Sequence, residues 1–148
     1  MKKSKILLAI LIFISSTVCY SNNNKAEIFY NQAISSIKNG HETKAIHFFQ
    51  KAAKLGHAES QYMLGAAHAR GRGGLEVDYL EAVRWFTKSA KQGFAKGQHA
   101  LCIEYDAGDA FGGRNAKEAI KWCRKAANQN FDEAIIHLKE LEKNSTIK

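Results

Sequence analysis

The sequence of 148 residues repeats itself at an interval of 37, and this periodicity constrains the fold more than any other feature. Shifting the chain by that interval places Trp85 on Trp122 and Gly56 on Gly93. The positions that coincide across the copies are Ala45, Ala82 and Ala119; Phe48, Trp85 and Trp122; Lys51, Lys88 and Lys125; Ala53, Ala90 and Ala127; Gly56, Gly93 and Asn130; and Leu64, Leu101 and Leu138. Self-similarity at intervals of about 20–50 residues is typical of stacked structural repeats.

Each copy is predicted to form two helices. The first helices are expected at 25–38, 58–70 and 95–106, the second helices at 42–55, 78–92 and 115–129, and a closing helix at 132–143. The second helices carry apolar residues at helical spacing, as in Ala82, Trp85 and Phe86. Asp78 and Asn115 precede two of these helices, and both residue types are good N-caps.

The helix pairs predict an all-α fold. Gly56, Gly93 and Asn130 follow the second helices, where a left-handed residue commonly ends a helix. No stretch alternates convincingly with period two, so no sheet is expected. A single helix pair cannot bury its apolar face, whereas stacked neighbours can. We therefore expect a right-handed α-solenoid of antiparallel helix pairs, with about three hairpins plus a closing helix.

The N-terminal segment 1–21 has the pattern of a secretory signal peptide. Three lysines precede an apolar run at 6–14, and small or neutral residues follow it. The run is shorter than the roughly 20 residues that a transmembrane helix needs, so no membrane span is expected. Cleavage is predicted before Asn22 or after Cys19. Val18 departs from the small residue that a lipoprotein signal places before its cysteine, and lipidation at Cys19 stays open.

Export also changes the charge of the mature chain. Segment 1–21 holds three lysines and no acidic residue, so the formal charge falls from +8 to +5 on its removal. This balance helps solubility and favours an acidic partner, but it is a weak argument for nucleic acid, and none is expected. The remaining segments are a short polar linker at 22–24, a repeat domain at 25–143 (repeats at about 25–57, 58–94 and 95–131) and a disordered tail at 144–148.

The repeated residues resemble the Sel-one-like repeat (SLR) family, a relative of the tetratricopeptide repeats. The second copy matches the family pattern at Ala58, Leu64, Gly65, Gly71, Gly73, Asp78, Ala82, Trp85, Ala90 and Gly93. The third copy matches it at Ala95, Leu101, Tyr105, Gly108, Ala119, Trp122, Ala126, Ala127 and Asn130. The resemblance covers about 25–141 and implies protein–protein interaction, in bacteria often by exported adaptors.

Two cysteines, Cys102 and Cys123, depart from the family pattern. Their counterparts in the second copy are Gly65 and Phe86, which are expected to meet between the paired helices. Because both members of that contact are cysteine in one copy, and export implies an oxidising compartment, we expect a disulfide. Two independent buried thiols are the alternative.

A cysteine-rich SLR subgroup places a cysteine at the positions held here by Ala53, Ala90 and Ala127. The chain therefore does not resemble that subgroup, and the penicillin-binding or β-lactamase activity attributed to it does not carry over.

The first helices are expected to line the concave face of the solenoid. The inward rows are predicted as Glu27, Glu59, Lys96 and Glu133; Tyr30, Tyr62, His99 and Ile136; Ile34, Ala66, Ile103 and Glu140; and Ile37, Ala69, Asp106 and Lys143. Rings such as those of Tyr30, Tyr62 and His99 are enriched among interface anchors. The partner-binding residues are predicted as Tyr30, Ile34, Tyr62, Arg70, His99 and Asp106. As alternatives to partner binding, the three rings pack between neighbouring helices and Arg70 is only solvated.

No catalytic residue, metal ligand or cofactor is predicted. The six histidines offer no paired ligand motif. Ser35 and Lys38 have the spacing of a serine β-lactamase motif, but its companion elements are absent. We expect an exported, non-enzymatic scaffold, periplasmic or secreted, that binds a protein or peptide as a monomer or weak dimer. The alternatives are a periplasmic immunity protein that caps a toxin and a β-lactam or cell-wall hydrolase.

Overall fold

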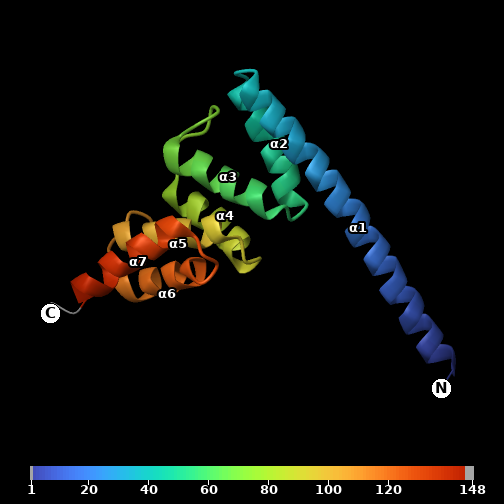
Figure 1. Cartoon of the computed structure of the whole chain (residues 1–148). Coiled ribbons are helices and arrows are strands. Elements are labelled where there is room, and N and C mark those ends of the chain that lie inside the picture. The colour runs from blue at the N-terminus through green and yellow to red at the C-terminus, as the bar shows by residue number, and fades with distance from the viewer. Residues whose placement is uncertain (1, 146–148) are drawn as a thin grey trace.

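The computed structural model describes the backbone of residues 2–145 and the side chains of residues 20–144. This part of the chain consists of helices joined by short loops and contains no strand. Its helices are α1 (Lys2–Lys38), α2 (Glu42–Lys54), α3 (Ala58–Arg70), α4 (Tyr79–Lys91), α5 (Ala95–Ala107), α6 (Ala116–Ala127) and α7 (Asp132–Ser145). Each helix packs on the next along the chain, and together they form three stacked hairpins closed by α7 (Figure 1). The predicted all-α solenoid is confirmed.

The two ends of the chain differ from the expected boundaries. Residues 22–24, predicted as a linker, lie inside the continuous helix α1, so that prediction is wrong. Asparagine is a poor helix former, but extending an existing helix by one residue costs far less than starting a new one. At the other end, α7 runs to Ser145, two residues into the predicted tail, and the rest of that tail lies outside the described residues.

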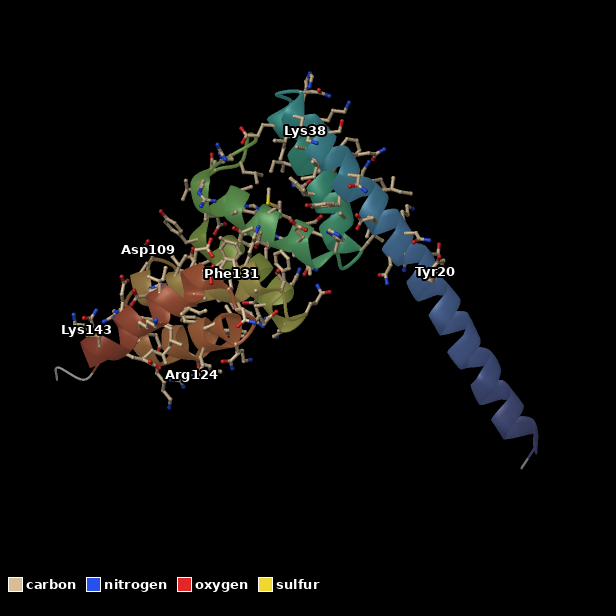
Figure 2. The ribbon with its side chains drawn as sticks, viewed as in Figure 1. Tyr20, Lys38, Asp109, Arg124, Phe131 and Lys143 are labelled. Atoms are coloured by element: carbon tan, nitrogen blue, oxygen red, sulfur yellow. A yellow bond between two sulfur atoms is a disulfide. The ribbon has the colours of Figure 1, made fainter. Side chains whose placement is uncertain are left out.

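The first half of α1 extends away from the repeats. It forms the free arm in Figure 1, and Tyr20, which is 72% exposed, lies where this arm leaves the body (Figure 2). The second half packs against α2, where Ala26 and Ala33 are buried.

The helix ends follow the sequence signals. The side chain of Asp78 accepts a hydrogen bond from the Glu81 backbone N–H at 2.9 Å, and Asn115 accepts one from Glu118 at 3.1 Å. Among the residues that end the second helices, Asn130 adopts a left-handed conformation with φ of 60°. Asn130 stands where the other repeats have glycine, and it adopts the left-handed conformation with which a helix commonly ends.

In the second and third hairpins, the middle of the first helix contacts the second helix at equivalent positions. In the second hairpin, Gly65 leaves room for the ring of Phe86, and a Cβ on residue 65 would lie 2.6 Å from that ring. The third hairpin replaces this contact with a disulfide between Cys102 and Cys123, whose Cα atoms are 5.2 Å apart. The predicted disulfide is confirmed.

Glutamine side chains connect consecutive hairpins. The amide of Gln98 on α5 donates to the carbonyl oxygen of Ala90 at 3.3 Å, near the end of α4. Gln129, just after α6, then donates to Gln98 Oε1 at 2.8 Å. Gln61 and Gln92 repeat this arrangement 37 residues earlier. The Ala53 and Ala90 carbonyls also accept a backbone N–H from Gly56 and Gly93, so each glutamine is an additional donor that connects the end of α2 or α4 to the next hairpin.

Candidate functional site

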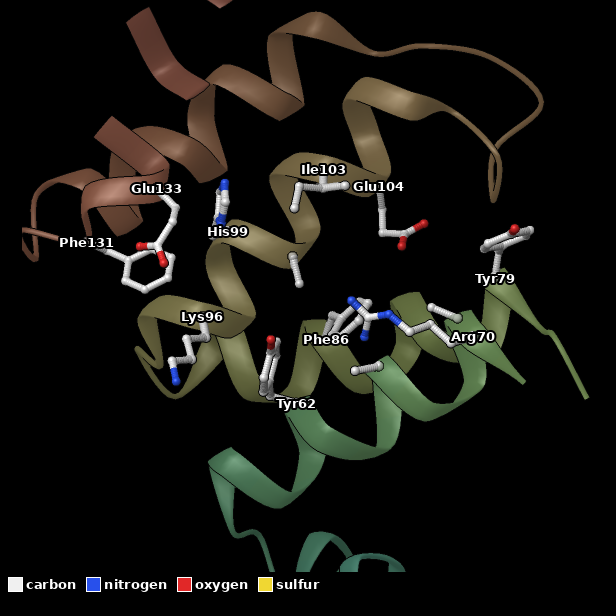
Figure 3. A pocket seen from close by; sticks show the side chains of 13 residues that line it. Tyr62, Arg70, Tyr79, Phe86, Lys96, His99, Ile103, Glu104, Phe131 and Glu133 are labelled. Atoms are coloured by element: carbon white, nitrogen blue, oxygen red, sulfur yellow. The ribbon is translucent and has the colours of Figure 1, made fainter. Parts of the chain in front are cut away.

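A pocket of about 470 Å³ opens between α3 and α5 and is closed at one end by the start of α7 (Figure 3). Its walls are Tyr62, Ala66, Ala69, Arg70, Tyr79, Phe86, Lys96, His99, Ala100, Ile103, Glu104, Phe131 and Glu133. Most of these residues belong to first helices, as the predicted inward rows require. A pocket with ring and aliphatic walls and a few charged groups is the usual form of a binding site.

The charged groups of the pocket lie at its two ends. Lys96 and Glu133 lie beside Phe131 and His99 at one end, and Arg70 and Glu104 lie near Tyr79 at the other (Figure 3). Both ends therefore present a positive and a negative side chain. Between them the floor is apolar, and Ile103 remains 45% exposed. This surface can hold an extended segment with apolar side chains in the middle and polar groups at either end.

Glu104 is the most buried charged residue of the pocket, with 8% of its surface exposed. Burial raises its pKa, and the negative charge of Asp109 adds to the effect. A buried carboxylate is costly without a positive or hydrogen-bonding partner. Glu104 is therefore suited to receive a donor group from a ligand.

A smaller cavity of about 250 Å³ adjoins the pocket on the side of α1 and α2. The two share Tyr62, Ala66 and Arg70, and the smaller one also contacts Ile37 and Phe49. The shared residues form a wall between the hollows, which together extend along the first and second hairpins.

The three predicted rings of the concave face each pack on the ring at the corner before the next first helix. Tyr30 contacts His57 with centroids 4.7 Å apart, Tyr62 contacts Phe94 at 5.8 Å, and His99 contacts Phe131 at 5.4 Å. These contacts join consecutive repeats, so the alternative interpretation of packing between helices describes all three. Tyr62 and His99 in addition line the pocket, whereas Tyr30 does not.

Only three of the six predicted partner-binding residues come together. Tyr62, Arg70 and His99 line the pocket. Tyr30 and Ile34 pack against the core of the first hairpin. The sixth residue, Asp106, lies outside the pocket lining and has intramolecular partners.

Asp106 accepts a hydrogen bond from Arg114 Nε and lies 3.3 Å from His137 Nε2. Burial raises the pKa of its carboxyl, but the hydrogen bonds and charges of Arg114 and His137 outweigh burial and lower it. The neighbouring His99 has a lowered pKa because it is desolvated and faces His137, although Glu133 opposes the shift.

Five pocket residues belong neither to the predicted inward rows nor to the predicted partner-binding residues, namely Tyr79, Phe86, Ala100, Glu104 and Phe131. Tyr79 stands at the start of α4 and Glu104 lies on α5 one position after the predicted Ile103. Tyr79 lies on a second helix, and only first helices are predicted to line the concave face. Its position next to the N-cap Asp78, at the mouth of the loop between α3 and α4, is a signal that could have found it.

Among the described residues, none of the helices combines the length and hydrophobicity that crossing a bilayer requires.

Comparison with known proteins identifies the repeats. The Sel1 repeat model matches three consecutive segments, 38–57, 58–94 and 95–131. The comparison with curated protein sequences returned no significant match.

The solved structures that resemble the chain are also repeat proteins. A Sel1 repeat protein from Oxalobacter formigenes is 31% identical, with a TM-score of 0.60 over 65% of this chain and 38% of its own length. The protective antigen c5321 of uropathogenic Escherichia coli, which displays an SLR fold, is 23% identical, with a TM-score of 0.67 over 83% of this chain and 25% of its own. Cysteine rich protein B of Helicobacter pylori is 19% identical, with a TM-score of 0.64 over 80% of this chain and 95% of its own length.

The chain thus spans well under half the length of the Oxalobacter and Escherichia coli proteins. The likeness to the Escherichia coli and Helicobacter proteins concerns the fold alone. The Sel1 repeat model, by contrast, covers more than half of the sequence in three adjoining units. This chain belongs to the Sel1 repeat family.

Proposed function

We propose that this protein is exported and that it binds an extended segment of a partner protein in the pocket between α3 and α5. Sel1 repeat proteins generally act as scaffolds for protein–protein interaction. The observation that carries the proposal is the pocket itself, with Ile103 exposed on an apolar floor between two charged ends. Exposed apolar surface that is rimmed by polar residues marks interaction sites.

The charges of the pocket give the binding mode. Arg70 can hold a carboxylate of the partner in a bidentate pair. Glu104 can accept a hydrogen bond from a backbone amide or a basic side chain that enters the same end. The positive balance of the repeats would speed the approach of an acidic partner without determining which segment binds.

Export is supported by three features. The first 21 residues carry the lysine-rich and apolar pattern of a signal peptide. The corresponding part of α1 extends away from the repeats, so its removal leaves the hairpins in place. The disulfide between Cys102 and Cys123 suits an oxidising compartment. Mass spectrometry of the protein from fractionated cells should find an N-terminus at Tyr20 or Asn22, and an intact N-terminus in the cytoplasmic fraction would contradict export.

Partner binding is tested by affinity purification of the protein from the cells that produce it, after chemical crosslinking. A pocket variant carries Arg70→Glu and Ile103→Asp, both at exposed positions. A control variant carries Lys91→Glu and Leu80→Asp, which make the same charge changes at exposed positions outside the pocket. A partner that is retained by the control and lost by the pocket variant supports the proposal. A partner retained by both variants would place binding elsewhere.

A further inference from the structure

Four side chains with metal-binding atoms meet where α5, α6 and α7 pack together. They are His99 and Cys102 on α5, Cys123 on α6 and His137 on α7, and we call them the α5–α7 cluster. One ligand atom from each of His99, Cys123 and His137 lies within 4.8 Å of the other two. Cys102 joins them through its disulfide to Cys123 and its Sγ lies 3.6 Å from His137 Nδ1.

The spacing of the nitrogen atoms suits a tetrahedral metal ion. His137 Nδ1 lies 3.4 Å from His99 Nε2. Bond lengths of about 2.0–2.1 Å to nitrogen and about 2.3 Å to sulfur place neighbouring ligands of a tetrahedral zinc ion about 3.3–3.8 Å apart. Both distances from His137 Nδ1, to His99 and to Cys102, fall within that range. In the oxidised protein the bonded sulfur atoms leave no thiolate to bind a metal.

A hydrogen bond to Asp106 orients the His137 ring of the cluster for binding a ligand. His137 Nε2 donates to Asp106 Oδ2 at 3.3 Å, and Arg114 holds the same carboxylate from the other side. This bond fixes the proton of a neutral His137 ring on Nε2 and leaves the lone pair of Nδ1 facing His99 and Cys102. Histidines that bind metals are commonly held in this way by a carboxylate on the other ring nitrogen.

We propose that reduction of the disulfide converts the α5–α7 cluster into a Cys₂His₂ site for Zn²⁺. A phosphine or a dithiol supplies the two electrons. With a phosphine, the S–S bond breaks, the two sulfurs take up two protons, and the phosphine takes oxygen from water to become a phosphine oxide. Zn²⁺ then binds the two sulfurs as thiolates and releases those two protons. His99 also lines the large pocket, which gives the ion a path from solvent.

The site has two exclusive states. The oxidised chain holds a disulfide, and the reduced chain holds zinc. Zinc would therefore replace one crosslink between α5 and α6 by another that also includes α7. This inference does not depend on partner binding in the pocket.

The test is a titration with Co²⁺, a spectroscopic probe of zinc sites, on the whole chain with the disulfide reduced by a phosphine in the absence of oxygen. We expect one Co²⁺ per chain with the intense visible bands of a tetrahedral ion and the charge-transfer absorption of thiolate ligands, both abolished by Zn²⁺. The oxidised chain should show neither. Pale octahedral cobalt in the reduced chain would overturn the proposal, because it would lack thiolate ligands.

Variants separate this site from surface binding. His137→Ala should weaken Co²⁺ binding at least ten-fold, and Asp106→Asn should weaken it by about ten-fold because it removes only the orienting carboxylate. The control His47→Ala changes an exposed histidine on α2 and should leave the affinity unchanged. Equal affinities for all three variants and the wild type would overturn the proposal. Circular dichroism on each reduced variant verifies that its helices are intact.

A second readout follows the thiols. Zn²⁺ should slow the reoxidation of the reduced wild type in air at least ten-fold, and it should have no such effect on His137→Ala. An equal rate of thiol loss with and without Zn²⁺ would contradict a zinc–thiolate site.

Discussion

Gly65 packs directly against Phe86, so closely that a Cβ at residue 65 would lie 2.6 Å from the ring. Substitution by a larger side chain forces the two helices of the second hairpin apart. Gly65→Val should therefore lower the free energy of unfolding by about 2 kcal/mol. Urea unfolding followed by circular dichroism measures it.

Gly113→Val is the control for this prediction, because a Cβ at that exposed position meets no atom within 4 Å. It should change the free energy of unfolding by less than about 0.5 kcal/mol. Equal effects of the two substitutions would show that the contact between Gly65 and Phe86 does not limit the packing of the hairpin.

The disulfide should stabilise the third hairpin through the entropy of the unfolded chain. Cys102 and Cys123 are 21 residues apart, and closing a loop of this size contributes about 3 kcal/mol in the chain-entropy model. Replacing both cysteines by alanine should lower the free energy of unfolding by at least this amount. Phosphine treatment of the metal-free wild type should produce a similar loss and should not affect the alanine variant. An unchanged urea midpoint after reduction would contradict the prediction.

The glutamine bridge should carry part of the coupling between the second and third hairpins. Gln98→Ala removes the side-chain donor of the buried Ala90 carbonyl, which keeps the backbone N–H of Gly93, and it removes one of two acceptors of the Gln129 amide, which keeps the Gly93 carbonyl. The free energy of unfolding is expected to fall by about 0.5–1.5 kcal/mol, the usual net contribution of a hydrogen bond. Gln32→Ala, at an exposed position on α1, should change stability by less than about 0.5 kcal/mol.

A double-mutant cycle tests whether Gln98 and Gln129 act together. Contacting residues in one hydrogen-bond network commonly show coupling of about 0.5–3 kcal/mol. Additive effects of Gln98→Ala and Gln129→Ala in urea unfolding would mean that the bridge between their side chains contributes nothing.

The fold could be predicted from the sequence because the repeat interval and the helix periodicity both report which residues face the core. Asp78, Asn115 and Asn130 signal helix ends locally, and the structure uses each of them as expected. The pairing of Cys102 with Cys123 also followed from the register, because their counterparts in another repeat are in contact.

The site could be predicted only in part, because it depends on contacts between elements far apart in the sequence. Asp106 has the register of a concave-face residue, yet Arg114 and His137 bind its carboxylate. His137 is not among the predicted inward residues, because its neighbour Ile136 holds that position of the register. Periodicity gives the face of a helix, but it does not report which long side chain reaches across to a neighbouring element.

The phenol of Tyr30 should lose its proton at a higher pH than an ordinary tyrosine. Burial, a hydrogen bond to Glu59 and the negative charges of Glu59 and Glu27 raise its pKa from 10.0 to about 12. Because the folded-state pKa is the higher one, the stability that this phenol contributes is complete below pH 10 and is lost as the pH rises toward about 12. The ultraviolet absorbance of tyrosinate, taken as the difference between the wild type and Tyr30→Phe, measures the pKa.

Glu59→Gln should bring the pKa of Tyr30 down, because it removes a charge and weakens the hydrogen bond. Glu76→Gln, in the exposed loop between α3 and α4, should leave that pKa where it is. A Tyr30 pKa near 10 in the wild type would contradict the burial of this phenol and its hydrogen bond to Glu59.

The most direct test of partner binding in the pocket is site-specific photocrosslinking in the producing cells. A photoreactive amino acid is placed at Ile103, on the floor of the pocket, or at Leu80, which is 57% exposed and lies outside it. We expect a discrete adduct with one protein from position 103, which is lost with Arg70→Glu, and no such adduct from position 80. The same adduct from both positions, or an adduct from position 80 alone, would contradict it.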